Sequence, residues 1–483
     1  MEALKLHADR YFDPDPDVRS IARDLYESVK DLPLVCPHGH VEPRLLAENE
    51  PFPEPTSLII TPDHYIFRML YSQGIGLDQL GIPTRDGTAV ETDPRKIWQV
   101  FGEHYYLFRG TPTRAWLDYE LYHVFGIRTK LDADSAMRVY DEMLEKLQSP
   151  EFLPRALFDQ FDIEVLTTTD AAADSLEYHL AIQESEWDGD VIPCFRPDTL
   201  FRIASPGWLD ELEALEKAAD TEISFFSDFI AALERRRVFF RDMGAVSTDH
   251  AVVEPFTHRL SDRELESIFE SALRGDVGTH DQREFEGHML MEMARMSVDD
   301  GLVMQIHPGA YRNHNLELQE RFGADNGADI PLRTEYTKNL HELLNAFGND
   351  SRFRLVVFTL DETTYSREIA PLAGHYPAMR LGPAWWFFDS IEGMRRYREM
   401  TTETAGVYNT AGFNDDTRAF LSIPARHDLS RRVDANYVAG LVASHQIDMH
   451  DAREMVRATA YDLVRETYRL DERTSAVSSA AGK

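Results

Sequence analysis

The chain has 483 residues, of which 43% are hydrophobic, and its 84 acidic and 50 basic residues give a formal net charge of −34. This length accommodates one barrel with insertions, and the hydrophobic content is sufficient for a large core. A surface this acidic repels phosphate backbones and anionic lipids, so we expect neither nucleic-acid binding nor membrane binding.

The two cysteines, Cys36 and Cys194, are too few for a disulfide framework in a chain of this length. The N-terminal segment has no basic stretch followed by an apolar run, and no apolar run approaches the roughly 18 residues of a membrane span. We therefore predict a cytoplasmic protein. No linker rich in Pro, Gly or Ser divides the chain, so residues 1–483 are expected to form one catalytic domain, with 475–483 as a disordered tail.

Short apolar runs recur along the chain, each ending in polar or aromatic residues and each followed by a helical stretch. The eight runs are residues 32–35, 163–166, 191–192, 245–246, 302–306, 353–360, 379–381, and 406–408 with 412–413. Eight parallel strands in a closed barrel bring their carboxyl ends to one face, where barrel enzymes keep their chemistry. A doubly wound open sheet is the alternative, but no Gly-rich phosphate loop follows the first run. We predict an α/β fold, a distorted (β/α)8 barrel.

The first two runs lie about 120 residues apart, far more than a strand-to-helix connection needs. Residues 67–161 are rich in Leu and aromatic residues at helical spacing, such as Trp98, Phe101 and Tyr105. They are expected to form a helical insertion within the barrel. Residues 200–241 and 261–297 are also expected to be helical.

His38 and His40 stand two residues apart where the first run ends. Residues at this spacing in a strand point to the same side, so both imidazoles can face one ion such as Zn²⁺. An isolated pair of this kind is weak evidence, and its position at a strand end strengthens it. Cys36 is not expected to be a ligand, because no further Cys or His stands at a zinc-finger spacing.

The last run leads into Asp415, Asp416, Thr417 and Arg418. In a closed barrel the last strand lies beside the first, so a carboxylate here can be a third metal ligand or a base close to the metal. Alternatively, Asp415 or Asp416 only caps the following helix. The histidine pair favours the ligand interpretation for Asp416.

The remaining strand ends carry further polar residues. His307 ends the fifth run, and Asp249 with His250 ends the fourth; each is either a site residue or a buried hydrogen-bonded residue. No Lys ends any run, whereas two-metal barrel hydrolases often use a carboxylated Lys as a bridge, so one metal is expected.

Arg196, Arg418, His64 and Tyr65 complete a set that suits an anionic, hydroxylated substrate. Arg binds carboxylates through a bidentate fork. Each Arg could equally be a solvated side chain or part of a salt bridge, and Arg196 at a strand end is the better candidate.

From about residue 11 to about residue 468 the chain resembles the uronate isomerases of the amidohydrolase superfamily, whose barrels are of the metal-dependent hydrolase type. The segments that carry the resemblance occur in one order: PHGH at 37–40, DHY at 63–65, TTD at 168–170, DSLE at 174–177, RPD at 196–198, STDH at 247–250, HPGAYRN at 307–313, WWF at 385–387, DDTR at 415–418 and FLS at 420–422. Several motifs at strand ends are far more specific than a lone histidine pair.

The resemblance implies interconversion of D-glucuronate with D-fructuronate, and of D-galacturonate with D-tagaturonate, in hexuronate catabolism. It implies one divalent metal ion, with zinc favoured, held by His38, His40 and Asp416. The substrate-pocket positions it implies are His64, Tyr65, Arg196, His307, Trp385, Trp386 and Arg418. This chain departs from many relatives by having Cys36 and Pro37 where an acidic residue precedes the histidine pair, which puts the hydrogen-bond partner of His38 in doubt.

Such an isomerase moves a proton between C2 and C1 through an enediol, whose developing negative oxygen needs positive charge nearby. Arg418 is the candidate stabiliser, and Tyr65 and Asp416 are the candidate proton carriers. A Tyr with a pKa near about 10 is a poor base unless a cation such as Arg418 lowers that pKa. Base and acid cannot be assigned individually from the sequence.

Two other functions are compatible with parts of this pattern. One is a metal-dependent hydrolase of the same superfamily, acting through metal-bound hydroxide. The other is a non-catalytic barrel that binds sugar acids. The absent bridging Lys argues against the first and the complete set of site residues against the second. We expect a homo-oligomer with a small-molecule hexuronate substrate; the choice among Zn²⁺, Mn²⁺ and Co²⁺ stays open.

Overall fold

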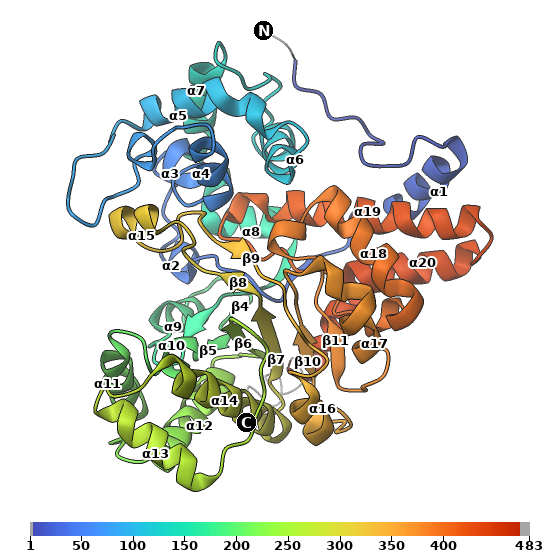
Figure 1. Cartoon of the computed structure of the whole chain (residues 1–483). Helices are drawn as coiled ribbons and strands as arrows, with labels where there is room; N and C mark the ends of the chain where they lie inside the picture. Colours follow the sequence, from blue (N-terminus) through green and yellow to red (C-terminus); the bar gives the residue numbers. More distant parts are fainter. Residues whose placement is uncertain (1–2, 474–483) are drawn as a thin grey trace.

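The computed structural model describes residues 3–473, so the predicted disordered tail at 475–483 lies outside the described residues. At its centre parallel strands form a ring (Figure 1). Hydrogen-bonded neighbours run in the orders β1-β2-β4 and β11-β10-β7-β6-β5-β3. In the described part of the chain the strands of the ring are β1 (Leu34–Cys36), β2 (Ile163–Thr167), β3 (Asp170–Ala171), β4 (Val191–Ile192), β5 (Phe195–Arg196), β6 (Ser247–Val252), β7 (Val303–Pro308), β10 (Leu355–Val357) and β11 (Met379–Leu381).

The two runs of neighbours form one wall of the barrel. β3 continues β2 and β5 continues β4 after a short break, and backbone bonds from Thr168 N to Ile192 O (2.9 Å) and from Asp170 N to Cys194 O (3.0 Å) bridge the break. β6 begins only after the predicted run 245–246 and ends six residues beyond it, and β7 ends two residues beyond the run 302–306, so Asp249, His250 and His307 lie within strands rather than after them.

The eighth wall segment is irregular, which corrects the strand predicted at residues 406–408 and 412–413, since neither stretch forms a strand. The backbone of Gly406 has φ +71°, and residues Val407–Asn409 form the 3-10 turn η8. A single parallel bridge joins Leu381 to Thr410. His40 N donates to Thr417 O over 3.0 Å and closes the ring. The predicted distorted (β/α)8 barrel is confirmed, with its distortion concentrated in the last strand.

Apolar side chains fill the barrel interior. Val35, Val165, Ile192 and Val303 belong to one buried cluster, as expected for parallel strands that are covered on both faces. The C-terminal segment closes this interior from below, where the hydroxyl of Tyr468 donates to the Gln305 side-chain oxygen over 2.7 Å.

Helices fill the long connection between β1 and β2 and form a cap above the strands (Figure 1). Trp98, Phe101, Tyr105 and Phe108 are all at most 1% exposed and share a cluster with Leu34 of β1, so the cap and the barrel have a continuous core. The elements are α2 (Pro43–Glu48), α3 (Pro55–Ile59), α4 (His64–Tyr71), η1 (Leu77–Leu80), α5 (Pro94–His104), η2 (Tyr105–Phe108), α6 (Pro112–Tyr119), η3 (Glu120–Val124), α7 (Ala136–Leu147), η4 (Pro150–Phe152) and α8 (Pro154–Gln160). Several of them begin at Pro, whose missing N–H costs nothing there.

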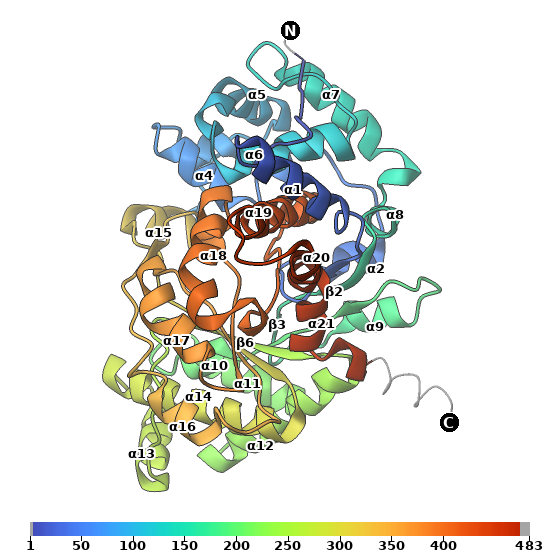
Figure 2. The ribbon, with the colours of Figure 1, turned by 90° about the vertical axis from the view of Figure 1, so that its right-hand side faces the viewer.

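The remaining helices surround the strands (Figure 2). They are α1 (Pro16–Glu27), α9 (Glu177–Gln183), α10 (Asp198–Phe201), α11 (Trp208–Ala219), α12 (Phe226–Asp242), α13 (Asp262–Leu273), α14 (Thr279–Asp300), α15 (Leu316–Phe322), α16 (His341–Phe347), η5 (Glu362–Thr364), η6 (Tyr365–Ile369), α17 (Ala370–Ala373), η7 (Trp386–Phe388), α18 (Ile391–Ala405), η9 (Phe420–Ser422), α19 (Ile423–Ala443), α20 (Met449–Arg457), η10 (Ala458–Asp462) and α21 (Leu463–Thr467). Among residues 3–473 none of the helices combines the length and apolarity that a membrane crossing requires.

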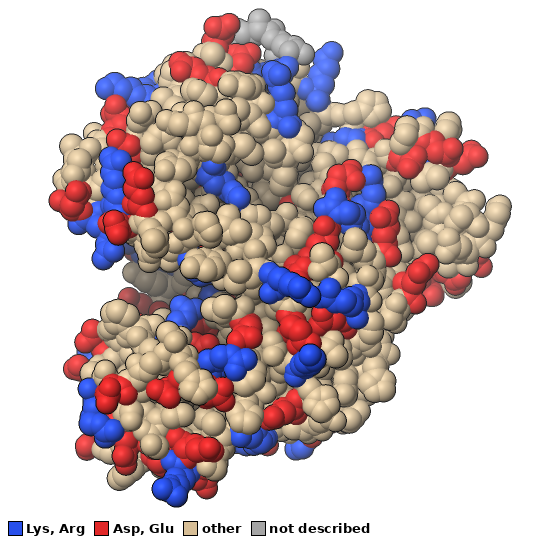
Figure 3. Space-filling model, viewed as in Figure 1, with Lys and Arg blue, Asp and Glu red and all other residues tan. Residues whose placement is uncertain are grey.

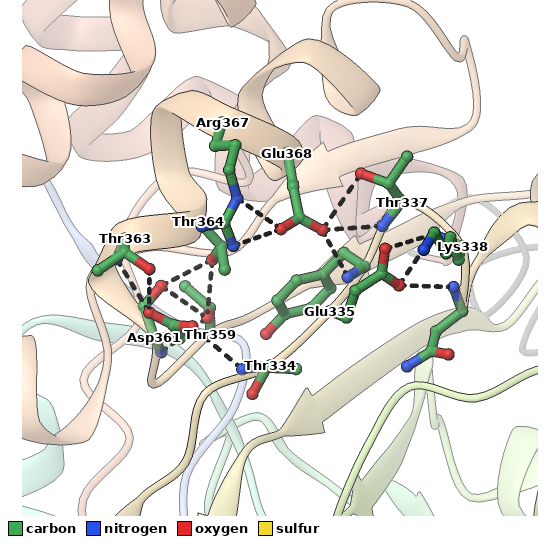
Figure 4. A network of polar contacts seen from close by, with 12 residues as sticks. Thr334, Glu335, Thr337, Lys338, Thr359, Asp361, Thr363, Thr364, Arg367 and Glu368 are labelled. Atoms are coloured by element: carbon green, nitrogen blue, oxygen red, sulfur yellow. Dashed lines mark hydrogen bonds and ion pairs between the residues drawn. The ribbon is translucent and has the colours of Figure 1, made fainter.

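A short antiparallel pair, β8 (Ala310–Tyr311) and β9 (Ile330–Pro331), follows β7, and a polar network anchors the chain after it (Figure 4). Glu368 accepts hydrogen bonds from the backbone N–H groups of Tyr336 (2.7 Å) and Thr337 (2.9 Å). Asp361 accepts one from the N–H of Thr334 over 3.0 Å. Two carboxylates thus fix the segment that leads away from the β8–β9 pair.

We predict that Glu368→Gln lowers the free energy of unfolding at neutral pH by about 1–3 kcal/mol, because the carboxylate receives several hydrogen bonds in a buried position. Burial raises the pKa of Glu368, but the N–H donors and Arg367 lower it more, so the net pKa lies below its usual value. The stabilisation is therefore present above the ordinary carboxyl pKa and is lost as the pH falls through the folded-state pKa.

Urea unfolding at pH 7 and at successively lower pH, for the wild type and Glu368→Gln, measures this difference. The exposed Glu145 supplies the control Glu145→Gln, which should leave the midpoint unchanged. A difference that stays constant across the pH range would contradict the prediction.

Candidate functional site

A cavity of about 440 Å³ opens where the carboxyl ends of the strands meet. The ten residues predicted for the site all line this one cavity, although they come from the ends of the separate strands β1, β5, β7 and β11, from the cap and from the closing segment. They are His38, His40, His64, Tyr65, Arg196, His307, Trp385, Trp386, Asp416 and Arg418.

His38, His40 and Asp416 form a group of donors that could hold a metal ion. The Nε2 atoms of His38 and His40 lie 3.4 Å and 3.2 Å from Oδ1 of Asp416. Ligands of a tetrahedral ion at about 2.0–2.2 Å lie roughly 3.3 Å from one another, so these separations fit such an ion.

The surroundings of Asp416 support this fit. Its Oδ1 atom is buried and receives no hydrogen bond from the described residues, while Oδ2 accepts one from the indole N–H of Trp385. Burial raises the pKa of the Asp416 carboxyl, but the two imidazoles lower it well below its usual range, so the carboxylate is ionised. A cation at the orphaned Oδ1 would replace the missing hydrogen bond.

The helix-cap alternative for the acidic pair is wrong. Helix α19 has Ser422 as its N-cap residue, and neither Asp415 nor Asp416 accepts a capping hydrogen bond from its first turn. Asp416 instead adopts a left-handed backbone with φ +39°. Such a conformation is uncommon for a residue other than Gly and concentrates at functional sites.

Two histidine nitrogens near this group lack partners among the described residues. Nδ1 of His38 is buried without a hydrogen bond, in keeping with the departure at Cys36 and Pro37. A metal-binding imidazole usually donates its second N–H to a carboxylate or carbonyl. His307 has its own buried Nε2 without a partner, and its ring lies 4.8 Å from that of His38.

A series of ion pairs lies behind His307. The Nδ1 atom of His307 contacts the Asp249 carboxylate, which also lies 3.4 Å from Nη1 of Arg196. Arg196 Nε donates to Asp198 over 2.7 Å. Although burial raises the pKa of Asp249, contacts with His307 and Arg196 lower it well below its usual range. His38, Asp249 and His307 also lie close enough to form a second donor group. The guanidinium of Arg196 beside Asp249 disfavours a second cation there, because like charges repel.

Arg418 and a second guanidinium lie at the outer rim. Arg418 Nη2 is 3.5 Å from Asp325, and Arg312 Nη1 is 2.7 Å from Asp329. Both carboxylates come from the loop between β8 and β9. Gly327 of this loop has φ +74°, and a Cβ atom there would lie 2.8 Å from the carbonyl oxygen of His64, so glycine permits the close approach to the cap.

Tyr65 and His64 begin helix α4, with Asp63 as the N-cap residue that accepts a hydrogen bond from Tyr65 N over 2.7 Å. The Tyr65 hydroxyl donates to the Trp386 carbonyl over 3.3 Å. Burial raises the pKa of Tyr65 well above its usual value, and the nearby Arg426 offsets this only in part. The cation beside Tyr65 is thus Arg426 and not Arg418.

Several lining residues were not among the predicted site residues: Asp63, Asp198, Arg202, Arg312, Asp325, Asp329 and Arg426. Asp63, Asp198 and Arg312 stand inside the motifs and were available as signals, and Asp249, for which a site role was left open, also lines the cavity. Asp325 and Asp329 lie in a loop without motif character, and Arg426 lies inside helix α19, so nothing local in the sequence marks them. Acidic and basic side chains are interspersed over the face of the molecule seen in Figure 3.

Comparison with known proteins gives consistent matches along nearly the whole chain. A family model described as glucuronate isomerase matches residues 17–468. The chain is 55% identical over 467 residues to a uronate isomerase of Nostoc punctiforme, covering 96% of this chain and 98% of the relative. A crystal structure of glucuronate isomerase from Caulobacter crescentus is 50% identical, with a TM-score of 0.95 and coverage of 97% and 98% of the two chains.

A more distant match concerns the fold alone. A protein from Lactobacillus casei, proposed to be a metal-dependent hydrolase, has a TM-score of 0.54 at 12% identity over 93% of this chain and 98% of its own. It supports the barrel type predicted from the sequence. The extent of the family match and the identity to the Nostoc relative show that this chain belongs to the glucuronate isomerase family.

Proposed function

We propose that this protein is an aldose–ketose isomerase that interconverts D-glucuronate with D-fructuronate, and D-galacturonate with D-tagaturonate, in hexuronate catabolism. The observation that carries the proposal is the Asp416 carboxylate, held between two imidazoles in a cavity that Arg and aromatic side chains line. Family membership and the names of the relatives support it.

One divalent ion, with zinc favoured, would be held by His38, His40 and Asp416 and would supply positive charge for substrate oxygens. Arg196 disfavours a second cation next to Asp249. This arrangement agrees with the absence of a Lys at the strand ends. Residues 67–161 would act as a helical insertion within a single catalytic domain, and Trp116 of this insertion packs against the ring of Tyr65.

The residues of the cavity would have different roles in the proton transfer. Asp416 is ionised and is our candidate for the base at C2. The raised pKa of Tyr65 keeps its phenol protonated, so it can donate to a substrate oxygen but is a poor base. Arg418, paired at 3.5 Å only with an exposed carboxylate, is free to stabilise the enediol oxygen. His64, Arg196, His307, Trp385 and Trp386 would position the sugar acid.

A hydrolase of the same superfamily is the second candidate, since a metal site of this kind can also activate water. The cluster of guanidinium groups in the cavity favours an anionic sugar acid instead. We expect a small-molecule substrate and a homo-oligomer in the cytoplasm.

The first test is turnover of uronates. Metal-loaded protein in D₂O with D-glucuronate should form the 2-ketose, and NMR spectroscopy should show deuterium or transferred protium at C1. D-galacturonate is assayed in parallel. Absence of ketose from both, together with hydrolysis of an ester, amide or lactone panel, would replace the isomerase by the hydrolase.

For Asp416→Asn we predict normal folding, a marked loss of bound metal and a fall in kcat/KM of at least about 10³-fold, because the change removes both a ligand charge and the base. Circular dichroism, metal analysis and the uronate assay measure these effects. The exposed Asp134 provides the control Asp134→Asn. Near-normal turnover with metal bound would refute the role of Asp416.

Replacement of Arg418 by Met should lower kcat by about 10²–10³-fold with little change in metal content, since the guanidinium would act on charge that develops only in the transition state. Arg138→Met, at an exposed helical ion pair, is the matched control. A variant as fast as wild type would remove the stabiliser role, and a change confined to KM would assign Arg418 to ground-state binding.

A further inference from the structure

A second group of donors lies outside the cavity and outside the proposed mechanism. Cys36 at the end of β1, Asp415 in the closing segment and His427 in helix α19 are each at most 3% exposed. His427 Nε2 lies 3.3 Å from Asp415 Oδ2 and 3.8 Å from Cys36 Sγ. Their donor atoms all lie within 4.8 Å of one another.

These separations resemble those around a bound ion. Thiolate, imidazole and carboxylate donors on a tetrahedral zinc or cobalt ion lie roughly 3.3–3.6 Å apart. Asp415 Oδ1 is also buried and receives no hydrogen bond from the described residues. The carboxylate can therefore offer both oxygens, which gives four donor atoms from three side chains.

The charge balance also suits a buried ion. A divalent cation deprotonates a coordinating thiol, and the proton leaves to solvent. One thiolate and one carboxylate then neutralise the ion, as a buried metal site requires.

We propose that Cys36, Asp415 and His427 form a second, structural binding site for a divalent transition metal of the zinc or cobalt type. His427 borders a separate cavity of about 390 Å³, lined also by Tyr26 and Leu34, and this cavity is the entry route that the proposal assigns to the ion. Although Arg431 lines the same cavity, the neutral metal cluster is not repelled by its charge.

An ion at this second site would make the site formed by His38, His40 and Asp416 more rigid. Cys36 precedes His38 by two residues, and Asp415 directly precedes Asp416. The ion would therefore tie the first strand to the closing segment and to helix α19 immediately behind the two ends that carry His38, His40 and Asp416. The expected consequence is a metal-dependent rise in thermal stability that the main site alone does not give.

Cobalt distinguishes the two sites because only the second contains sulfur. Metal-free, reduced, full-length protein is titrated with Co²⁺, and bound cobalt and near-ultraviolet absorption are recorded. We expect about two equivalents per chain and a thiolate-to-cobalt charge-transfer band, which nitrogen and oxygen ligands do not produce. Cys36→Ser and His427→Gln should each lose the band, one equivalent and the added thermal stability.

Two matched variants make the result specific. Cys194→Ser, at the other buried cysteine, should keep both equivalents and the band. His38→Asn should lose one equivalent but keep the band. One equivalent without a band in the wild type, or a band that persists in Cys36→Ser, would overturn the second site. One equivalent without a band would contradict the second site but not the proposed isomerase activity. A band without uronate turnover would contradict the isomerase activity but not the second site.

Discussion

The contact between the Asp416 carboxylate and the imidazoles of His38 and His40 joins the two ends of the barrel wall. The same short segment supplies the carboxylate and closes the ring, because Thr417 O accepts the hydrogen bond from His40 N. The donor group therefore exists only when the first strand and the closing segment meet. The proposed metal site is therefore assembled in the same step that closes the barrel. Its ligands are distant in the chain and come together only when the first strand and the closing segment meet.

Charge pairing determines what the cavity can accept. Arg196 pairs with Asp198, Arg312 with Asp329 and Arg426 with Asp389. An unpaired charge at the buried Arg426 would be costly, and pairing also fixes where all three guanidinium groups point. Arg418 differs, because its partner Asp325 lies on an exposed loop at 3.5 Å. An incoming carboxylate or enediol oxygen can replace that partner at little cost.

Three features could be predicted from the sequence. They are the repeat of strand and helix, the barrel that this repeat forms, and the ten predicted site residues that line the cavity. The helical stretches at 200–241 and 261–297 correspond to helices in the structure. The features that could not be predicted from the sequence depend on contacts between segments that are distant in the chain. The irregular last strand follows from positive φ angles at Gly406 and Asp416, which no apolar pattern reveals. Asp325 and Arg426 reach the cavity from a loop and a helix, and the raised pKa of Tyr65 comes from burial by distant segments.

The two consecutive carboxylates of the irregular closing segment face opposite sides. Asp416, whose backbone is left-handed, faces the cavity, while Asp415 faces helix α19. Near the first strand the separation has another cause: β1 ends at Cys36, which lies against His427, and the chain bends at His38, which faces the cavity. Each side of the seam thus carries a carboxylate and at least one imidazole, and each carboxylate keeps one buried oxygen without a hydrogen bond. Because an orphaned buried oxygen is costly, its occurrence on both sides of one seam argues for a cation on each.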